Sequence, residues 1–466
     1  MKTMSLSIIV LSTNNILLDS MFYMFKEMKI LKRITLKEVN SFISWYEDFM
    51  NNDNKDRPTI YSFKNHNKLE PKDIYWLTGF FDAEGTASVT TMKPNRFMFE
   101  YRIELHRDDL AALKFIMDTF EIGTITMNNR GQIMWRVKQF EEVSFLTNIF
   151  YSYPLITKKR FTVSTFNHIR YNYYNNRPLS NEQFQELVML KNKMNDRGLN
   201  LDHSEKLKEC NITINKYWLI GFLEGDGSLS FPHNRPGFHL SQKGSNYTML
   251  KIQEYLTDII SNEIPNWTSK VSTSTDKNRC VTVYITDMDA LYKVMIPYLY
   301  NNMKSRKIVD YKMWVISVNI YMNGYHFIKE GREIINMISN CINEKRYSTN
   351  NTPEELNIIN NKIMKINELY NSMINSIKPM FSVFEGMNYT YSTMAIKYSR
   401  IYSNKNIQIY IYDTVTKQLL EGSPFNTSTN ALKSLGLNPK NRAITRYLDY
   451  SKMFKNRYII TSEYKM

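Results

Sequence analysis

The chain has 466 residues, of which 43% are hydrophobic and 23% charged, so it can form two to four domains with real cores. Its 60 Lys and Arg against 45 Asp and Glu give a formal charge of +15, which favours nucleic acid or anionic lipid as a partner. The longest apolar run near the start, Leu6–Leu11, is far shorter than the roughly 20 residues of a membrane span, so we expect no membrane partner. Three scattered cysteines without a CxxC pair indicate neither a zinc knuckle nor a disulfide framework.

Residues 1–71 form an N-terminal extension with an apolar start and a charged, Asn-rich connection, and no motif is visible in it. Asn, Lys, Ile and Tyr are abundant along the whole chain, whereas there are only 15 glycines. This bias is typical of an AT-rich genome. It suggests an organelle or an AT-rich microbe. The mitochondrion is the expected location, and otherwise a reducing compartment like the cytoplasm.

A long internal repeat begins at Tyr75. The stretch YWLTGFFDAEGTASV, Tyr75–Val89, recurs as YWLIGFLEGDGSLSF, Tyr217–Phe231. Each copy is followed by two strands of alternating apolar and polar residues, a helix, a second hairpin and a final amphipathic helix. The sequence therefore predicts an α+β fold with two αββαββα repeats, over residues 72–205 and 206–345, related by pseudo-twofold symmetry.

Small residues recur at matched positions in the two copies. Gly79 and Ala83 are spaced i, i+4, as are Gly221 and Gly225, so each pair lies on one face of its helix. Glycine inside a helix costs about 1 kcal/mol relative to alanine, which indicates a packing reason. Two independent, locally crowded core helices are the alternative. The matched positions favour two helices that pack closely on each other.

An acid follows the small residues in each copy. Glu84 and Asp226 are each followed by a glycine, Gly85 or Gly227, which we expect to cap the helix C-terminus. In a helix pair the two carboxylates would lie near each other and near two helix C-termini, an arrangement that like charges and helix dipoles disfavour. A divalent cation would offset this repulsion, and hard oxygen ligands suit Mg²⁺ or a similar ion such as Mn²⁺. The alternative is that one acid is protonated or salt-bridged.

A second pair of acids, Asp82 and Glu224, lies two residues earlier in each copy. These side chains should face elsewhere on the helix. We expect them to accept hydrogen bonds from local backbone or from basic side chains.

The two copies resemble the LAGLIDADG motif of homing endonucleases in the single-chain form with two repeats, over about residues 72 to 345. The resemblance implies two saddle-shaped antiparallel sheets that lie along the DNA major groove, and a metal ion held by the last acid of each motif, Glu84 and Asp226. It also implies a basic residue near each acid, here Lys159 in YPLITKKRF and Lys307 in MKSRKIVDY. These four residues would hydrolyse one phosphodiester on each strand.

Target reading requires hydrogen-bond donors on the sheet face that meets DNA. A merely solvated face is the alternative for any single residue, and both base and phosphate contacts are expected. The candidates are Lys93, Arg96, Arg102, Arg130, Gln132, Arg136 and Lys138 in the first repeat, and Arg235, Gln242, Lys243, Lys270, Lys277 and Arg279 in the second.

The last part of the chain has a different pattern. Residues 346–403 are predicted to be an Asn-rich linker with one long helix, and residues 404–466 a small α/β module. A strand, a short helix, a Leu-Gly-Leu-Asn turn and a helix opened by proline outline a helix-turn-helix. The module resembles nuclease-associated modular DNA-binding domains, with Lys440, Arg442 and Arg446 as candidate contacts. A basic module that only packs on the core is the alternative.

Together these features predict a monomeric, intron-encoded endonuclease that cuts both strands of a long double-stranded DNA target. The alternative is an RNA maturase that assists splicing of its host group I intron, with or without DNA cleavage, and that binds intron RNA. A DNA-binding protein without cleavage is a third class. Neither of these needs acids at the helix ends, so the presence of both Glu84 and Asp226 favours cleavage.

Overall fold

The computed structural model describes most of the chain from residue 58 onward. The described residues are 58–93, 95–128, 132–194, 202–277, 280–342, 353–380, 390–391, 394–395, 408–438, 441, 443–449 and 453–464. All of them belong to one compact unit, Pro58–Phe381 with Thr390–Met466. Most of the predicted N-terminal extension lies outside the described residues.

The first repeat follows the predicted order as far as its second hairpin and then adds two helices before the last one. Its elements are α3 (Pro71–Glu84), β1 (Gly85–Met92), β2 (Arg96–His106), η1 (Arg107–Asp109), α4 (Leu110–Phe120), β3 (Thr124–Met127), β4 (Gln132–Val137), α5 (Phe140–Ser152), α6 (Lys159–Asn175) and α7 (Asn181–Lys193). Helix α6 was not expected, because its polar sequence has few strong helix formers and starts directly after an irregular segment.

The second repeat has the same order. After α8 (Ser204–Lys208), its elements are α9 (Lys216–Asp226), β5 (Gly227–Ser230), η3 (Pro232–Asn234), β6 (Gly237–Lys243), α10 (Asn246–Glu263), β7 (Ser272–Thr275), β8 (Cys280–Ile285), α11 (Met288–Ala290), the π-helical turn η4 (Leu291–Met295), α12 (Ile296–Leu299), α13 (Lys307–Met322), η5 (Tyr325–Phe327) and α14 (Lys329–Ser339). The α+β fold class with two repeats is therefore confirmed.

Each repeat contributes one antiparallel four-stranded sheet. The strand orders are β1-β2-β4-β3 and β5-β6-β8-β7. Alternate residues of each sheet, such as Tyr101 and Ile103 or Phe238 and Leu240, are fully buried, so one face of each sheet packs on the core. The opposite faces carry the polar rows in which the sequence placed the DNA contacts.

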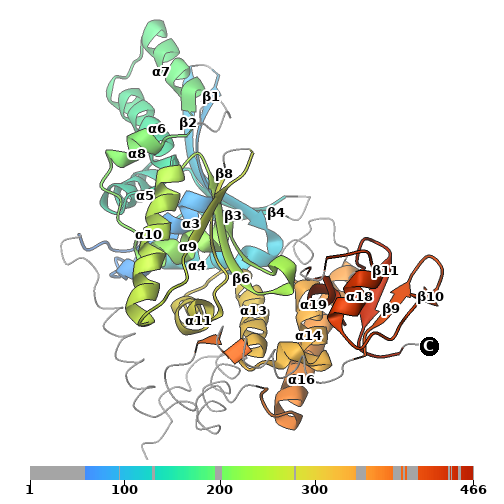
Figure 1. Cartoon of the computed structure of the whole chain (residues 1–466). Helices are drawn as coiled ribbons and strands as arrows, with labels where there is room; N and C mark the ends of the chain where they lie inside the picture. Colours follow the sequence, from blue (N-terminus) through green and yellow to red (C-terminus); the bar gives the residue numbers. More distant parts are fainter. Residues whose placement is uncertain are drawn as a thin grey trace, which may run out of the picture. The chain divides into compact units, whose positions relative to one another are not determined.

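Helices α3 and α9 lie side by side at the centre of this core (Figure 1). A Cβ added to Gly79 would lie 1.9 Å from the Trp218 carbonyl oxygen, and one added to Gly221 would lie 2.1 Å from that of Trp76. A Cβ on Gly225 would come within 2.2 Å of the Ala83 Cβ. The backbones therefore approach as closely as only these small residues allow, and the predicted helix pair is present.

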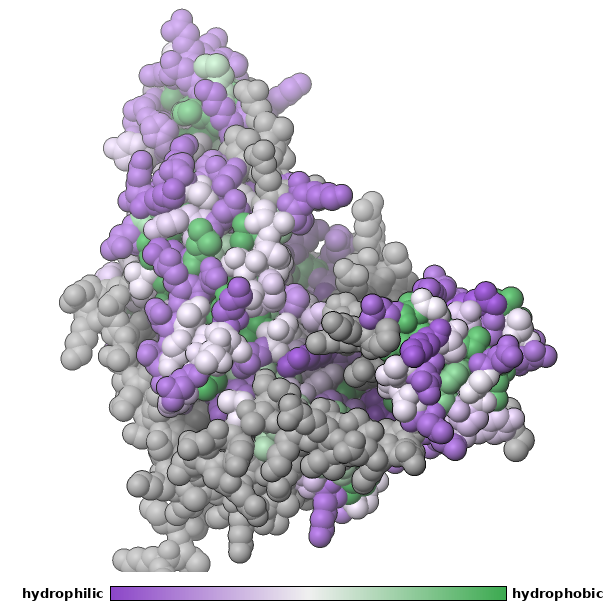
Figure 2. All heavy atoms as spheres, in the orientation of Figure 1, coloured by the Kyte–Doolittle hydropathy of each residue, from purple (hydrophilic) through white to green (hydrophobic). Residues whose placement is uncertain are grey.

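On the face shown in Figure 2, the coloured side chains are mainly hydrophilic, and hydrophobic ones are scattered among them. No helix in the described part of the chain is both long and apolar enough to cross a membrane.

The C-terminal part contains α16 (Pro353–Ser376), the long helix expected before the module, and then a small three-stranded sheet with two helices. The module's elements are β9 (Tyr410–Asp413), β10 (Gln418–Leu419), α18 (Ser428–Ser434), α19 (Ala443–Tyr447) and β11 (Tyr458–Thr461). Ile411, Leu432, Ile444 and Ile460 form its core.

The helix-turn-helix outline is present in this module, but its second helix is shorter than predicted. Gly436 takes the left-handed φ of 66° that the turn requires. Helix α19 begins at Ala443, and the Asn441 side chain accepts the Ala443 backbone N–H. Lys440 and Arg442 lie outside the described residues, and Arg446 lies in α19.

Candidate active site and DNA interface

The two motif acids end the two central helices. Glu84 is the last residue of α3 and Asp226 the last of α9. Gly85 and Gly227 are not left-handed caps, since their φ angles are −70° and −86° and each begins a strand. Glycine is needed there for space, because a Cβ would lie 2.3 Å from the Phe81 ring in α3 or 2.0 Å from a Leu223 methyl in α9.

Both acids are half-buried, and Glu84 lies against the other central helix. A Cβ at Gly225 would come within 3.0 Å of the Glu84 Cγ. Burial raises the pKa of Glu84, and the nearby Lys159 and Lys307 oppose the rise. Burial also raises the pKa of Asp226 to about 7, with Lys159 opposing and Glu84 adding to the rise. The repulsion expected from the sequence is therefore present.

The two predicted lysines cap the same helix ends. Lys159 begins α6, and its Nζ donates to the carbonyl oxygens of Phe81 at 3.2 Å and Ala83 at 2.5 Å. Lys307 begins α13, and its Nζ donates to those of Leu223 at 3.0 Å and Gly225 at 2.7 Å. Burial lowers the pKa of both lysines, and the neighbouring carboxylates oppose the change. The ammonium groups thus offset the negative ends of both helices.

The earlier acid of the first motif positions the loop that carries Lys159. Fully buried Asp82 accepts hydrogen bonds from the Ile156 N–H at 2.9 Å, the Thr157 hydroxyl at 2.6 Å and the Trp218 indole at 2.9 Å. The expected backbone partners are therefore present, but they lie 74 and 75 residues away and are not local.

The second motif repeats this arrangement. Glu224 accepts from the Lys304 N–H at 2.8 Å, the Ser305 N–H at 2.5 Å and the Trp76 indole at 2.6 Å. Each of these carboxylates therefore connects three parts of the protein. These are its own helix, the loop before the candidate lysine of the same repeat, and the tryptophan of the other repeat.

Two further contacts link the repeats beside the acids. The Arg306 side-chain Nε lies 2.9 Å from Asp109 Oδ2, and the Arg306 N–H donates to Asp109 Oδ1 at 2.9 Å. At the related position, the Lys158 N–H donates to the Ser245 hydroxyl at 3.0 Å. A cavity of about 270 Å³ opens here, with Glu84, Asp109, Arg306 and Lys307 among its lining residues.

The donor set at the helix ends fits a hard divalent cation. Within the described ranges no group of three or more His, Cys, Asp or Glu side chains is placed to hold a metal ion. Glu84 and Asp226 would thus be the side-chain ligands, and Mg²⁺ commonly takes one or two carboxylates and keeps several waters. No hydrogen bond from another described residue reaches the half-buried Glu84 carboxylate. Its oxygens are therefore open to a cation.

Gln242 belongs to this cluster and not to the outward polar row. It is opposite Val281 in the sheet and shares the core-facing side of Leu240. Its side-chain Nε2 donates to Asp226 Oδ2 at 2.6 Å. Alternation along β6 was the signal that could have separated Gln242 from its exposed neighbour Lys243.

In the first repeat the other predicted contacts follow the outward face. Arg96, Arg102 and Arg136 lie on this side of β2 and β4, with Arg102 opposite Arg136 in the register. Arg136 forms an ion pair with buried Glu100, so its charge is partly used within the protein. Lys93 is exposed in the β1–β2 turn, Lys138 is exposed after β4, Gln132 begins β4, and Arg130 lies outside the described residues.

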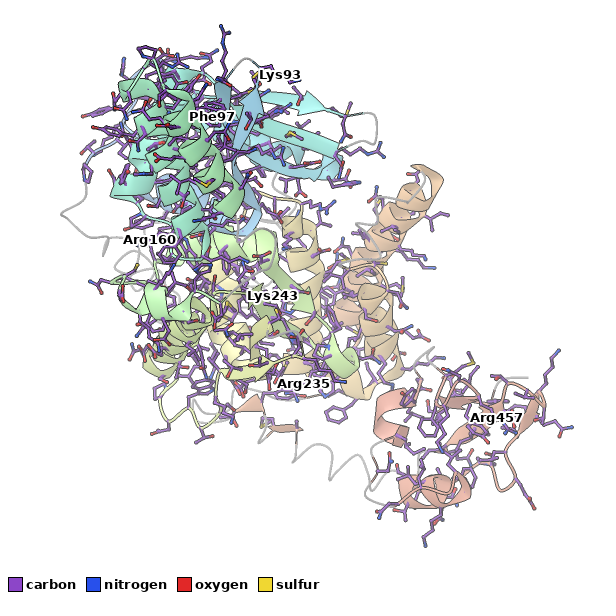
Figure 3. All side chains as sticks on the ribbon, turned by 90° about the horizontal axis from the view of Figure 1, so that it is seen from above. Lys93, Phe97, Arg160, Arg235, Lys243 and Arg457 are labelled. Carbon is purple, nitrogen blue, oxygen red and sulfur yellow. The ribbon has the colours of Figure 1, made fainter. Side chains whose placement is uncertain are left out.

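The second repeat has fewer predicted contacts on strands. Lys243 is exposed at the end of β6 (Figure 3). Lys270 and Lys277 are exposed before β7 and in the β7–β8 connection. Arg235 lies in the connection before β6, with its guanidinium 5.5 Å from the centre of the Tyr391 ring. Arg279 lies outside the described residues.

Several functional-site residues were missed by sequence reasoning. Trp76 and Trp218 occupy matched positions in the repeat, and this match was a usable signal for a shared role. Thr157 and Ser305 both precede a candidate lysine by two residues and both are buried. The Asp109–Arg306 pair carries no such signal, because its partners come from different repeats.

Comparison with known proteins identifies both halves of this site. The family model described as LAGLIDADG endonuclease matches residues 77–170 and 219–318. The chain is 27% identical over 412 residues to the uncharacterized mitochondrial protein RF1 of Saccharomyces cerevisiae, covering 84% of this chain and 82% of that protein. It is 24% identical over 293 residues to the probable intron-encoded endonuclease Cox1-I1b of Schizosaccharomyces pombe, covering 57% and 68%.

Among solved structures, the LAGLIDADG homing endonuclease I-GzeII in complex with its DNA target has a TM-score of 0.48 and 22% identity, covering 59% of this chain and 99% of that one. The two stretches matched by the family model contain the C-terminal parts of both central helices, both motif acids and both lysines. The two repeats of this chain therefore match the LAGLIDADG endonuclease family.

Proposed function

We propose that this protein is a mitochondrial, intron-encoded endonuclease that acts as a monomer. It cuts both strands of a long DNA target by hydrolysis that depends on a divalent cation such as Mg²⁺. The observation that carries the proposal is the meeting of Glu84 and Asp226 at the ends of two paired helices, each directly before the first strand of a polar-faced sheet. The names of the fungal relatives agree with this function and location.

Glu84 and Asp226 would hold the cation, which when bound supplies positive charge to the phosphate and activates water. The protein's own residues orient the carboxylates and set the electrostatic environment of the phosphate. Gln242 holds one Asp226 oxygen by a hydrogen bond, which fixes the rotation of that carboxylate. The buried environment strengthens every electrostatic interaction with a phosphate that enters it.

Lys159 and Lys307 would stabilise charge on the scissile phosphates. An ammonium group has three N–H donors, and each of these lysines uses two on helix carbonyls. The third donor is left for a phosphate oxygen or an ordered water. Because two bonds fix each Nζ, the third direction is set before substrate arrives, which reduces the reorganisation needed in the transition state.

The outward rows of the two sheets would read the target. Lys93, Arg96, Arg102 and Lys243 are the strongest candidates, since each lies in or directly beside a strand of the first hairpin of its repeat and no ion pair with another described residue engages it. The other contacts inferred from the sequence stay predictions: Arg130, Gln132, Arg136, Lys138, Arg235, Lys270, Lys277 and Arg279. In the C-terminal module the same holds for Lys440, Arg442 and Arg446.

Cleavage of fragmented mitochondrial DNA that lacks this reading frame tests the function. The purified full chain with Mg²⁺ should produce double-strand cuts at one site. Glu84→Gln and Asp226→Asn should each lower the cleavage rate by at least about 100-fold. Glu186→Gln on α7 and Asp258→Asn on α10 replace exposed acids in the same way and should leave it unchanged. No cuts, with tight and specific RNA binding instead, would support the maturase alternative.

A further inference from the structure

The first hairpins of the two repeats differ in length. Strands β1 and β2 have 8 and 11 residues, whereas β5 and β6 have 4 and 7, so each strand of the second hairpin is four residues shorter. Both hairpins start at the motif glycine, with Gly85 opposite Ile103 and Gly227 opposite Leu240. The shortening therefore affects the outer end, away from the acids. At about 3.3 Å per residue this is a difference of about 13 Å, or about four base pairs of duplex.

The long first hairpin is supported at its outer end by α7. The Phe97 ring stacks on Phe184 with centroids 4.7 Å apart, and the Lys191 Nζ donates to the Thr91 hydroxyl at 3.2 Å. Figure 3 shows Lys93 and Phe97 near each other at this end of the first repeat. Hence Lys93 is held where it can contact outer base pairs of one half-site.

The short second hairpin is instead tied back onto α13. The Tyr321 hydroxyl donates to the Asn234 carbonyl at 3.1 Å, and the Trp314 indole donates to the Gly237 carbonyl at 3.2 Å. These bonds fix the β5–β6 connection on the helix layer. The second sheet thus has no counterpart to the outer half of the first hairpin.

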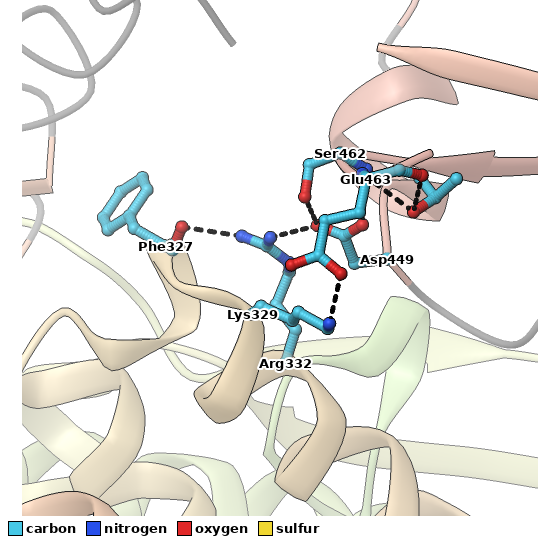
Figure 4. A network of polar contacts seen from close by, with 7 residues as sticks. Phe327, Lys329, Arg332, Asp449, Ser462 and Glu463 are labelled. Carbon is cyan, nitrogen blue, oxygen red and sulfur yellow. Dashed lines mark hydrogen bonds and ion pairs between the residues drawn. The ribbon is translucent and has the colours of Figure 1, made fainter. Parts of the chain in front are cut away.

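Helix α14 follows α13 as α7 follows α6, and it holds the C-terminal module close to that short hairpin. The His326 ring just before it stacks on Tyr321, with centroids 4.3 Å apart. Arg332 in the first turns of α14 donates to the neighbouring Phe327 carbonyl at 2.6 Å and also to Asp449 of the module (Figure 4). A short series of contacts therefore leads from the β5–β6 connection to the module.

This contact is a buried anchor. The Arg332 and Asp449 side chains are only 8% and 4% exposed. The Ser462 N–H and hydroxyl donate to the same carboxylate at 2.6 and 2.8 Å, and Lys329 pairs with the adjacent Glu463 (Figure 4). Burial alone would raise the pKa of Asp449, but Arg332 and Ser462 hold it below its usual range. The carboxylate therefore stays ionised and paired.

The anchor leaves the rest of the module basic. From residue 405 to the end of the chain there are four acids. Asp449 and Glu463 pair with cations of α14, Asp413 pairs with Arg457, and only Glu421 has no ion pair with another described residue. By contrast, the exposed cations of its described residues are Lys417, Lys433, Lys455 and Arg457. A surface with paired acids and exposed cations is suited to bind a polyanion, such as a phosphate backbone.

We propose that the C-terminal module, locked to α14 by Arg332 and Asp449, takes the place of a longer second hairpin and binds the DNA backbone of the outer base pairs of that half-site. This inference rests on the proposed DNA cleavage. With the module bound there, the protected DNA would be nearly equally long on both sides of the cut, although the two sheets differ in hairpin length.

Hydroxyl-radical footprinting of the full chain on its cleaved site, with Ca²⁺ in place of Mg²⁺, tests the inference. The triple variant Lys417→Gln, Lys433→Gln, Lys455→Gln should lose protection of about four outer base pairs on one side only. The slope of log affinity against log salt should fall by about 1 for each phosphate that the variant no longer neutralises. Cut positions should not change. Lys93→Gln should weaken protection at the opposite end and so identify the two half-sites.

A matched control is Lys362→Gln, Lys365→Gln, Lys378→Gln, which removes three exposed charges on or just after α16. It should keep the complete footprint. The inference is overturned if the module variant keeps its footprint and salt slope, or if the wild-type footprint is already about four base pairs shorter on the second side. Absence of any DNA cleavage or binding by the wild-type protein would instead reject the proposed function itself.

Discussion

The indole N–H of Trp218 donates to Asp82 at 2.9 Å, so the second repeat completes the buried carboxylate of the first. The reciprocal bond joins the Trp76 indole to Glu224 at 2.6 Å. The same carboxylates hold the loops that precede Lys159 and Lys307. The two carboxylates that pair the repeats therefore also position the two lysines.

Replacing Trp218 by phenylalanine should weaken both the pairing of the two repeats and the placement of Lys159. The change removes one donor from fully buried Asp82, so the free energy of unfolding should fall by about 1–3 kcal/mol, and the smaller ring adds a packing loss. Cleavage should also slow, because the Thr157 loop before Lys159 is less firmly held. Urea denaturation and single-turnover cleavage measure the two effects. Trp267→Phe, which loses a half-buried bond of 3.3 Å to Asp287, is the control and should cost less. Equal losses in both variants would contradict the shared role.

The two kinds of motif acid should respond in opposite ways to neutral replacement. Glu84→Gln removes a buried charge whose pKa is raised by burial, so it should abolish cleavage while stabilising the protein or leaving its stability unchanged. Asp82→Asn should cost about 2–4 kcal/mol, since an amide presents one acceptor oxygen to donors that now reach two. Thermal unfolding separates the two classes. A loss of stability in Glu84→Gln as large as that in Asp82→Asn would refute the distinction.

Alanine at Gly79 should separate the central helices. Its Cβ would lie 1.9 Å from the Trp218 carbonyl oxygen, and the obstacle is backbone, which cannot rotate away. We expect a loss of about 3 kcal/mol or more, at the upper end of measured point-mutation effects. Gly237→Ala is a suitable control, because its nearest atom is 3.2 Å away in the His239 side chain. Circular dichroism during heating compares them, and similar melting temperatures would argue against close helix packing.

Much of this site was predictable because a repeat displays each signal twice. Matched small residues predicted the helix pair, and the acids at Glu84 and Asp226 predicted the charge cluster. The capping role of Lys159 and Lys307 was not predictable, since it depends on where α6 and α13 begin in space. Gln242 was misplaced because a list of polar residues ignores which side of a strand each one occupies. The buried pair of Arg332 and Asp449 joins residues 117 apart in sequence, and neither has a local pattern that indicates the other.

Stability without metal should depend on pH through the helix-end acids. The pKa of Asp226 is raised to about 7 from its usual 3.8, so the folded state holds this proton more tightly than the unfolded chain does. The contribution to stability is therefore present at low pH and is lost as pH rises from about 4 to 7. An isolated carboxyl with this shift would lose about 4 kcal/mol across that window. The raised pKa of Glu84 acts in the same direction.

A divalent cation should reverse this loss by binding the ionised acids. We expect Mg²⁺ to raise the melting temperature of chelator-treated protein by several degrees at pH 8 and to have little effect at pH 5. Asp226→Asn should flatten the pH dependence and remove most of the Mg²⁺ effect, whereas Asp258→Asn on α10 should change neither. Differential scanning calorimetry at the two pH values, with and without Mg²⁺, measures all of these quantities. Equal stabilisation by Mg²⁺ at pH 5 and pH 8 would place the cation at some other group, because only ionised carboxylates at the helix ends give it a pH-dependent affinity in this window.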